Sequence, residues 1–378
     1  MALAVGLMSG TSLDGVDAAL VDIQGSGLET KLQLIEFTSY PLGNDIVEKI
    51  KEVLSIENSS VDKICSLNVE LGYVFSEAVK AVCAKANVSL EQLTFVASHG
   101  QTIYHLPVPR FNQISSTLQI GESSVIAEET KTTVVSDFRT RDMAVKGQGA
   151  PIVPYSEFVL YRDADRTRLL QNIGGIGNVT VIPKGAQMTE LLAFDTGPGN
   201  MIIDELCQYF YQQPYDKNGV YAAGGKVHLD LLDELMEHPF IKRTYPKTTG
   251  REDFGVEYTT ALIEKWKQKI EPDDLIATAT QFTARSIAEN VRPFANEQTD
   301  LIIGGGGSYN PTLVQMIRNE LPELTVLVQE DIGYSSEAKE AIAMTVLANQ
   351  TLNHLPSNVP SATGAEKPVI LGKITYYH

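Results

Sequence analysis

The turn at residues 9–17, SGTSLDGVD, carries side chains suited to binding a phosphate and its metal ion. Its glycine and polar positions are Gly10, Thr11, Ser12, Asp14, Gly15 and Asp17. The glycines permit backbone geometry and close approach that a Cβ atom would block. The hydroxyls and turn amides can bind an anion, and the two carboxylates can reach a hydrated Mg²⁺ ion. The pattern suggests nucleotide chemistry, and the alternative is an ordinary β-hairpin with a polar turn.

Asp195 is the strongest candidate for a general base. It lies in FDTGPGN, residues 194–200, at the carboxyl end of a predicted strand, where ligands gather in open α/β sheets. Pro198 and the glycines make a rigid turn, and Asn200 can cap a helix that begins at Met201. A carboxylate fixed here can take a proton from a hydroxyl or water. The alternative is an Asx turn that organises only its own loop.

A charged segment, DFRTRD at residues 137–142, directly follows an apolar strand. Arg139 and Arg141 can bind a carboxylate or a phosphoryl group through their planar donors. Asp137 and Asp142 can hold these arginines or a metal-bound water. The alternative is a solvated loop of paired charges.

His99 lies in SHGQT, where another strand is expected to end. Its ring can donate to a substrate hydroxyl or carboxylate, although a lone histidine is more often structural. His105 follows closely, but the spacing fits no zinc site.

Two further glycine clusters occupy residues 174–178 and 304–307. The first, GGIGN, lies between predicted strands and is a second candidate phosphate-binding turn. The second follows an apolar strand and lets the backbone lie against a flat ring such as adenine. Neither is specific alone, and no Gly-Lys-Ser/Thr follows as a Walker A loop requires. The first turn lies in a hairpin, which excludes the dinucleotide-binding fingerprint.

The composition is that of a globular protein with a large core. The chain has 378 residues, 43% of them hydrophobic and 20% charged. A net charge of −17, from 47 acidic and 30 basic residues, argues against binding to nucleic acid or an anionic membrane. Cys65, Cys83 and Cys207 are too few and scattered for disulfides or zinc, and indicate buried thiols in a reducing compartment. No apolar run approaches a membrane span, so we expect a cytoplasmic protein.

The order of predicted elements positions these candidates in two similar halves. After the opening hairpin, strands are expected at residues 32–40, 93–98, 117–120 and 132–136, and helices at 46–54, 64–86 and 123–130. The second half has expected strands at residues 169–173, 179–182, 191–194 and 301–303, and helices at 201–211, 227–236, 258–269, 277–294 and 337–347. Residues 355–365 are expected to form a loop, and residues 369–377 a short final strand. The repeated order predicts two tandem α/β domains with mixed sheets, facing each other across a cleft suited to a nucleotide.

The motifs together resemble those of the anhydro-N-acetylmuramic acid kinase family, within the sugar kinase/Hsp70/actin superfamily. The resemblance runs from Gly6 to Lys373. It rests on GLMSGTSLDGVD (6–17), SHGQTIYH (98–105), LQIGE (118–122), DFRTRD (137–142), GQGAP (147–151), NIGGIGN (172–178), FDTGPGNMIID (194–204), KTTGREDF (247–254) and GGGGSYNP (304–311). It implies two actin-like, ribonuclease H-like α/β domains around a central nucleotide cleft. The first domain would comprise residues 1–140 plus about 364–378, and the second residues 141–363.

The resemblance also implies an activity and a set of site residues. The family adds water across the 1,6-anhydro bridge of its sugar and phosphorylates the freed O6 with ATP and Mg²⁺, giving N-acetylmuramic acid 6-phosphate and ADP. Asp195 would be the general base, and Asp14 and Asp17 would hold Mg²⁺ through water. The residues expected at ATP are Gly10, Thr11, Ser12, Leu13, Asp14, Gly15, Val16, Asp17, Gly174, Gly175, Asn178, Gly305, Gly306 and Ser308. Those expected at the sugar are His99, Gln101, Arg139, Arg141, Asp142, Gln148, Asn172, Gly197 and Asn200.

Two other functions fit the same fold. One is a kinase for a different 1,6-anhydrosugar such as levoglucosan. The other is a non-catalytic ATP-driven clamp of the actin or Hsp70 class, for which Arg139, Arg141 and Asp195 are more than is required. Lys146 departs from the family pattern, which usually has a small residue there, and adds a cation near the expected site. The expected partners are ATP, an anhydrosugar and a second copy in a homodimer, without nucleic acid or membrane.

Overall fold

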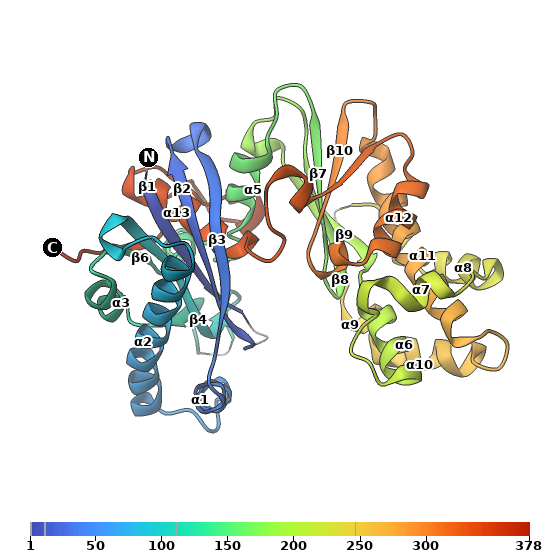
Figure 1. Ribbon diagram of the computed structural model, residues 1–378, viewed down its shortest axis with the longest axis horizontal. Helices are drawn as coiled ribbons and strands as arrows, with labels where there is room; N and C mark the ends of the chain where they lie inside the picture. The colour runs from blue at the N-terminus through green and yellow to red at the C-terminus, as the bar shows by residue number, and fades with distance from the viewer. Residues whose placement is uncertain (1, 11–12, 111, 246) are drawn as a thin grey trace. The chain divides into compact units, whose positions relative to one another are not determined.

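The computed structural model describes residues 2–10, 13–110, 112–245 and 247–378 (Figure 1). Thr11 and Ser12, expected at the first phosphate turn, lie outside the described residues. The chain forms two compact units. The N-terminal unit comprises Met1–Leu160 and Glu337–His378, and the central unit comprises Tyr161–Ser336. These limits differ from the domain limits at residues 140 and 364 that were expected from the sequence. The expected division and the observed one both place the last strand of the chain with the first domain.

The N-terminal unit contains a mixed sheet. Its strands in the described chain are β1 (Ala2–Ser9), β2 (Gly15–Gln24), β3 (Lys31–Pro41), β4 (Leu93–Leu106), β5 (Ser116–Ile120), β6 (Val134–Ser136) and β12 (Lys373–Thr375). The strand order is β12-β6-β4-β1-β2-β3, and β5 pairs with β4. β1, β4 and β6 run parallel, whereas β1–β2 and β2–β3 are antiparallel.

Helices pack on both faces of this sheet. Those in the described part of the unit are α1 (Asn44–Leu54), α2 (Val61–Lys85), α3 (Ser123–Thr130), α4 (Thr140–Met143), α5 (Pro154–Tyr161, crossing the unit limit), α13 (Lys339–Leu352) and α14 (Pro360–Thr363). Apolar residues at helical spacing, including Leu67, Leu71 and Phe75, bury one side of α2 in the core formed with Val5 and Leu7 of β1.

The two faces of β1 contact different helices. Leu7 belongs to the core that contains α2, whereas a Cβ atom on Gly6 would lie 1.9 Å from the Ala341 carbonyl oxygen of α13. Because successive strand residues face opposite sides, α2 and α13 cover opposite faces of the sheet.

The central unit repeats this topology. Its strands in the described chain are β7 (Thr167–Ile173), β8 (Ile176–Ile182), β9 (Leu192–Pro198), β10 (Thr299–Gly304) and β11 (Thr325–Val328). Its helices there are α6 (Met201–Tyr211), α7 (Val220–Gly224), α8 (Leu229–Met236), α9 (Arg251–Phe254), α10 (Val256–Trp266), α11 (Pro272–Val291) and α12 (Pro311–Glu320). β10 is buried along its whole length, as a strand covered on both faces must be.

The strand order β9-β8-β7-β10-β11 of the central unit matches β3-β2-β1-β4-β6 of the N-terminal unit. In both, three antiparallel strands are followed by two strands parallel to the first. This is the ribonuclease H-like order, so the fold class expected from the sequence is confirmed, as is the internal duplication.

Several expected element limits were wrong. β4 does not end at His99 but continues to Leu106, because residues beyond Gly100 pair with β5 in an antiparallel hairpin. β9 likewise extends past Asp195 to Pro198 through its pairing with β8. The loop expected at residues 355–365 contains the short helix α14. The helix expected at residues 337–347 is displaced to Lys339–Leu352.

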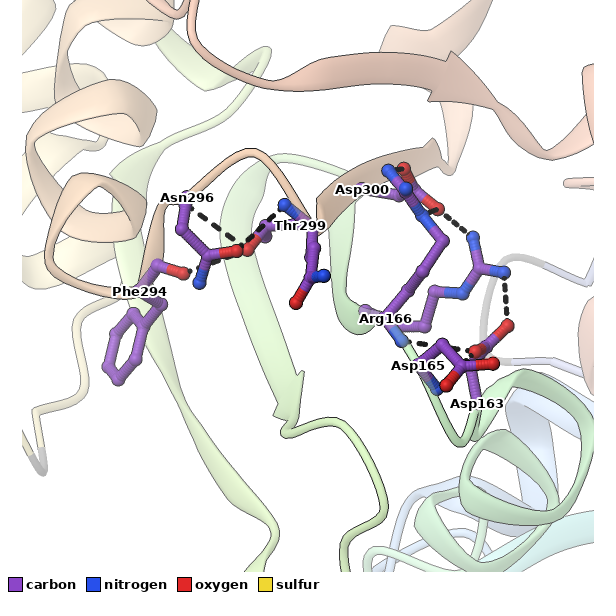
Figure 2. Close-up of polar contacts among 9 residues, drawn as sticks. Asp163, Asp165, Arg166, Phe294, Asn296, Thr299 and Asp300 are labelled. Atoms are coloured by element: carbon purple, nitrogen blue, oxygen red, sulfur yellow. Dashed lines mark hydrogen bonds and ion pairs between the residues drawn. The ribbon is translucent and has the colours of Figure 1, made fainter.

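A buried ionic network ties together the amino ends of β7 and β10 (Figure 2). Asp300, with 5% of its side chain exposed, accepts hydrogen bonds from both Arg166 and Arg168. Arg168 also pairs with Asp163 at 2.8 Å, and Asp163 accepts from the backbone N–H groups of Asp165 and Arg166. One buried carboxylate therefore binds two arginines where β7 pairs with β10.

Replacing Asp300 with asparagine is expected to destabilise the protein by about 3 kcal/mol, because two arginines lose a common buried partner. The free energy of unfolding from urea titration checks this. Glu237→Gln is the matched control, since its ion pair with Lys242 is exposed and should change stability little. Equal effects of the two substitutions would contradict the role given to Asp300.

None of the helices built by the described residues has the length and apolarity needed to cross a lipid bilayer.

Candidate active site

Asp195 lies in a row of polar side chains across three neighbouring strands of the central unit. Asn172 of β7 pairs with Asn178 of β8, and Asn178 pairs with Asp195 of β9. Directly paired residues share one face of a sheet, so the three half-buried side chains lie side by side. The sheet therefore brings together three residues that the sequence assigned separately to the sugar, to ATP and to catalysis.

The segment that follows residue 246 fixes Asp195 from the other side. The Thr249 N–H donates to Asp195 Oδ2 at 2.9 Å, and the Asp195 N–H donates to the Lys247 carbonyl at 3.0 Å. Burial raises the pKa of Asp195 above its ordinary value, Glu252 adds to the rise, and the Thr249 N–H opposes it. One carboxylate oxygen is thus held in place, and the group is a stronger base than a solvated aspartate.

Thr249 is itself held by Asp253, which accepts from its hydroxyl at 2.8 Å. Asp253 and Thr249 both lie in KTTGREDF, one of the motifs on which the family resemblance rests. No role was predicted for either residue. Their positions beside Asp195 depend on contacts between segments more than 50 residues apart in the chain, so spacing alone did not reveal them.

The second and third glycine clusters meet around Asn200. The Asn200 N–H donates to the Gly174 carbonyl at 2.8 Å, and the Gly199 N–H donates to the Gly175 carbonyl at 2.9 Å. A Cβ atom on Gly307 would lie 3.3 Å from Asn200 Oδ1 and closer still to Ile173. The backbone of both glycine segments therefore approaches one place, as a phosphate- and adenosine-binding surface requires.

The sequence suggested that the Asn200 side chain caps α6, but the structure shows no such bond. Asn200 occupies the N-cap position without a side-chain capping bond, and its Nδ2 donates instead to the Ile173 carbonyl at 3.4 Å. Ser308 Oγ donates to the Gly305 carbonyl at 2.7 Å and closes the third glycine turn, and Gly305 has a φ of +79°. Gly197 is buried against α11, where an added Cβ atom would lie 2.3 Å from Ser286 Oγ.

In the N-terminal unit, Arg139 and His99 form one hydrogen-bonded group. Arg139 Nε donates to His99 Nε2 at 2.9 Å, and Arg139 Nη1 donates to the Gly149 carbonyl at 2.8 Å. The opposite ring nitrogen of His99 donates to the Gly100 carbonyl at 2.8 Å. Burial and the neighbouring guanidinium lower the pKa of His99 to about 4, so the ring is neutral at pH 7. His99 therefore orients Arg139, whose Nη2 has no partner among the described residues.

Asp142 organises the loop that supports Arg139. Its side chain is fully buried and accepts from the Gly149 N–H, Asn358 Nδ2 and Thr363 Oγ1, at 2.9, 2.8 and 2.8 Å. These three partners are all protein groups, which favours a structural role over the sugar contact expected from the resemblance. By contrast, Arg141 and Gln148 are exposed.

The first glycine turn adjoins a pair of carboxylates. Asp17 lies on β2, and burial raises its pKa, with Asp14 adding to the rise and a Ser39 hydrogen bond opposing it. Burial also raises the pKa of Glu340 at the start of α13, and Asp17 adds to that rise while Arg139 opposes it. No role was predicted for Glu340, and its nearness to Asp17 and Arg139 follows from the packing of α13 on β1.

The remaining predicted residues of this unit have mixed placements. Leu13 and Val16 are buried, so only their backbone atoms can reach a ligand. Gln101 is buried and accepts from Ser9 Oγ at 2.6 Å. Lys146 is exposed and forms a 2.5 Å ion pair with Glu366, so its added charge is compensated at the surface.

A divalent ion here would be held in part by water. Among the described residues, no group of three or more His, Cys, Asp or Glu side chains is placed to bind a metal. Mg²⁺ commonly keeps several waters and takes one or two carboxylates together with substrate phosphates. The two carboxylates Asp17 and Glu340, whose pKa values are raised, fit that mode of binding.

Two ribonuclease H-like units, glycine turns and a half-buried strand carboxylate are the features expected of a sugar kinase in the actin-like superfamily. Comparison with known sequences is more specific. The sequence model of the anhydro-N-acetylmuramic acid kinase family matches residues 2–377. The anhydro-N-acetylmuramic acid kinase of Bacillus cereus (strain Q1) is 58% identical over 376 residues, covering 98% of both chains. That of Bacillus thuringiensis subsp. konkukian (strain 97-27) is 57% identical over 377 residues, again 98% of both chains. The chain belongs to the anhydro-N-acetylmuramic acid kinase family.

Two solved structures are similar to the chain at low sequence identity. A ROK family glucokinase from Streptomyces griseus, in complex with glucose and AMPPNP, has a TM-score of 0.39 and 11% identity, covering 91% of this chain and 98% of that chain. The activator of the 2-hydroxyisocaproyl-CoA dehydratase from Clostridium difficile, with bound ADPNP, has a TM-score of 0.46 and 11% identity, with coverages of 93% and 96%. The family membership confirms the resemblance found in the sequence, and the protein is an ATP-dependent kinase of anhydro-N-acetylmuramic acid.

Proposed function

We propose that Asp195 activates the water that opens the 1,6-anhydro bridge, and that the O6 so released accepts the γ-phosphoryl group of ATP. The observation that carries this proposal is the Asp195 carboxylate: it is half-buried, fixed through one oxygen, and has a raised pKa. A base of this kind suits proton removal near neutral pH.

The proposed reaction consists of two displacements. Asp195 takes a proton from water as the water oxygen bonds to the anomeric carbon, and the bond from that carbon to O6 breaks. O6 keeps the electron pair and attacks the γ-phosphorus, and ADP leaves. Asn178 and Asn172, beside Asp195 on the sheet, would position the water or sugar by hydrogen bonds.

Arg139 would stabilise negative charge on the substrates. Its Nε and Nη1 are engaged by His99 and Gly149, so the guanidinium is held in one orientation with Nη2 available. A planar donor fixed in this way suits a carboxylate or phosphoryl oxygen. His99, neutral and buried, would act as a positioning residue rather than as an acid or base.

The backbone of the glycine turns would bind ATP, and the residues proposed for this are Gly10, Gly15, Gly174, Gly175 and Gly305. Mg²⁺, when bound, would neutralise phosphate charge. Asp14 and Asp17, with Glu340, would hold it through water.

Asp17→Asn is expected to raise the KM for ATP about tenfold and to raise the Mg²⁺ concentration that half-saturates the rate, since outer-sphere metal partners typically matter by ~10–100-fold. Initial rates titrated with Mg²⁺ at fixed ATP check this, with Asp22→Asn on the same strand as the matched control. If Asp14→Asn and Asp17→Asn both leave the Mg²⁺ and ATP dependence unchanged, these carboxylates do not serve the metal.

ATP turnover measured with and without sugar tests the reaction. Anhydro-N-acetylmuramic acid should stimulate ADP release strongly, and levoglucosan much less. Turnover of ATP that no anhydrosugar stimulates would favour a clamp, and a preference for levoglucosan would favour the other kinase.

We also infer a cytoplasmic homodimer. Val108 and Ile114, in the connection between β4 and β5, are 61% and 81% exposed, and apolar side chains of this kind are often covered by a partner. Light scattering of the purified protein, at several concentrations, gives the oligomeric state directly.

A further inference from the structure

A pocket of about 550 Å³ lies within the N-terminal unit, bordered by α2, β5, the start of α3, the middle of β4 and the end of β6. Its volume is within the range of ~300–1,000 Å³ that is usual for small-molecule sites. Ser98, Gln119 and Cys65 line it. The roles proposed above for ATP and the sugar do not use these three residues.

The pocket adjoins the Arg139 group, because His99 lines it together with Ser98. Ser98 pairs with Leu7 of β1, and Leu7 belongs to the core that contains α2. His99, the next residue, bonds Arg139, whose charge interacts with Glu340 of α13. Since α2 and α13 cover opposite faces of the sheet, the Ser98 side chain and the His99 ring lie on opposite faces of β4, and the pocket borders both residues.

Two buried polar atoms at the pocket have no hydrogen-bond partner among the described residues. Ser98 is 1% exposed, and its Oγ is unpartnered. Gln119 Oε1 is also buried and unpartnered, although its Nε2 donates to Thr117 and Thr102 at 2.8 and 3.2 Å. Buried polar groups are almost always satisfied, so a missing partner indicates a ligand or ordered water. An oxygen acceptor and a hydroxyl together call for a ligand that both donates and accepts.

The charged groups at the pocket are already compensated by protein. Lys373 pairs with Asp137, and Glu122 accepts from Asn68 Nδ2 and the Ser124 N–H at 3.0 Å each. An uncharged ligand therefore fits better than an ion. Ile64, Leu118 and Ile120 add apolar surface beside the unpartnered atoms.

We propose that this pocket is a binding site for an uncharged pyranose, beside the residue that orients Arg139 and distinct from the residues proposed to bind ATP. The ring's hydroxyls would satisfy Ser98 and Gln119, and its C–H face would pack on the apolar side chains. The site depends on the N-terminal unit alone, so the proposal stands or falls independently of the reaction mechanism.

Cys65 provides a local probe of occupancy. It is exposed and lines the pocket, whereas Cys83 and Cys207 are buried, and burial raises their pKa values to about 11 and about 12. A thiol reagent at neutral pH should therefore modify Cys65 first. The full chain is labelled with and without N-acetylglucosamine, and mannitol serves as an acyclic control polyol.

N-acetylglucosamine should slow Cys65 labelling about fivefold, because a bound ligand of this size loses most of its surface to the pocket and shields the thiol. The protection should disappear in Ser98→Val, which removes the hydroxyl and narrows the pocket, and in Gln119→Leu. It should persist in Ser76→Ala, a buried serine on α2 whose hydroxyl bonds Gly72, and in Arg139→Lys.

Three outcomes would overturn the proposal. One is the absence of protection at saturating sugar in the folded wild-type protein. Another is protection that Arg139→Lys removes and Ser98→Val keeps, which would place the sugar in the kinase site. The third is labelling that slows with rising protein concentration without sugar, which would show that a second copy covers the pocket.

Discussion

Asp195→Asn is expected to lower kcat about a thousandfold, within the ~10²–10⁴-fold that general-base catalysis contributes, and to leave the affinity for ATP nearly unchanged. Asparagine keeps the size of the side chain and can still accept the Thr249 N–H, but it cannot take a proton from water. Steady-state rates and nucleotide binding by calorimetry check the two parts. Asp233→Asn, an exposed residue of α8, is the matched control.

The pH dependence of the wild type provides a second test of this role. Because the pKa of Asp195 is raised above its ordinary 3.8, kcat/KM should fall on the acid side at a higher pH than for a solvated aspartate. The same shift means that the folded protein binds this proton more tightly than the unfolded chain. Ionisation at pH 7 therefore opposes folding, and Asp195→Asn should raise the Tm at pH 7 and lose that advantage below pH 3.8. A variant with wild-type kcat would show that Asp195 is not the base.

Arg139→Lys is expected to lower kcat/KM for the sugar about a hundredfold, the cost of misplacing a charged donor by roughly 1 Å. Lysine keeps the charge, but it cannot bind His99 and Gly149 while presenting a further planar donor to substrate. Initial rates over a matrix of ATP and sugar concentrations separate kcat from KM.

The matched comparison for Arg139 is Arg141→Lys, two residues along the chain. Arg141 is exposed and should show the smaller effect. The kcat/KM of His99→Gln for the sugar should lie between that of the wild type and that of Arg139→Lys, because an amide can replace only part of the histidine's hydrogen bonding. Equal losses of kcat/KM in Arg139→Lys and Arg141→Lys would contradict the orienting role of His99 and Gly149.

Local sequence patterns predicted the elements that carry these residues but not how they meet. Glycine turns and apolar periodicity gave both ribonuclease H-like halves, because strand and helix formation depends mainly on nearby residues. The row of Asn172, Asn178 and Asp195 depends on the register of β7, β8 and β9. That register depends on the geometry of the connecting turns and on which face of each strand is buried, and the motifs alone did not specify these residue by residue.

Long-range contacts account for the other differences. The resemblance placed Asp142 at the sugar, whereas its buried carboxylate bonds Asn358 and Thr363, more than 200 residues away. The sequence assigned no role to Glu340, and its approach to Asp17 and Arg139 follows from α13 packing on the first sheet. In both cases the deciding partner comes from the far end of the chain.

Single-turnover reaction in ¹⁸O-labelled water, with ATP and anhydro-N-acetylmuramic acid, tests the central claim most directly. Water attack assisted by Asp195 should place one ¹⁸O atom at the anomeric carbon of the N-acetylmuramic acid 6-phosphate and none in the phosphoryl group. Product without label at the anomeric carbon, or label found in inorganic phosphate instead, would contradict hydrolysis coupled to transfer.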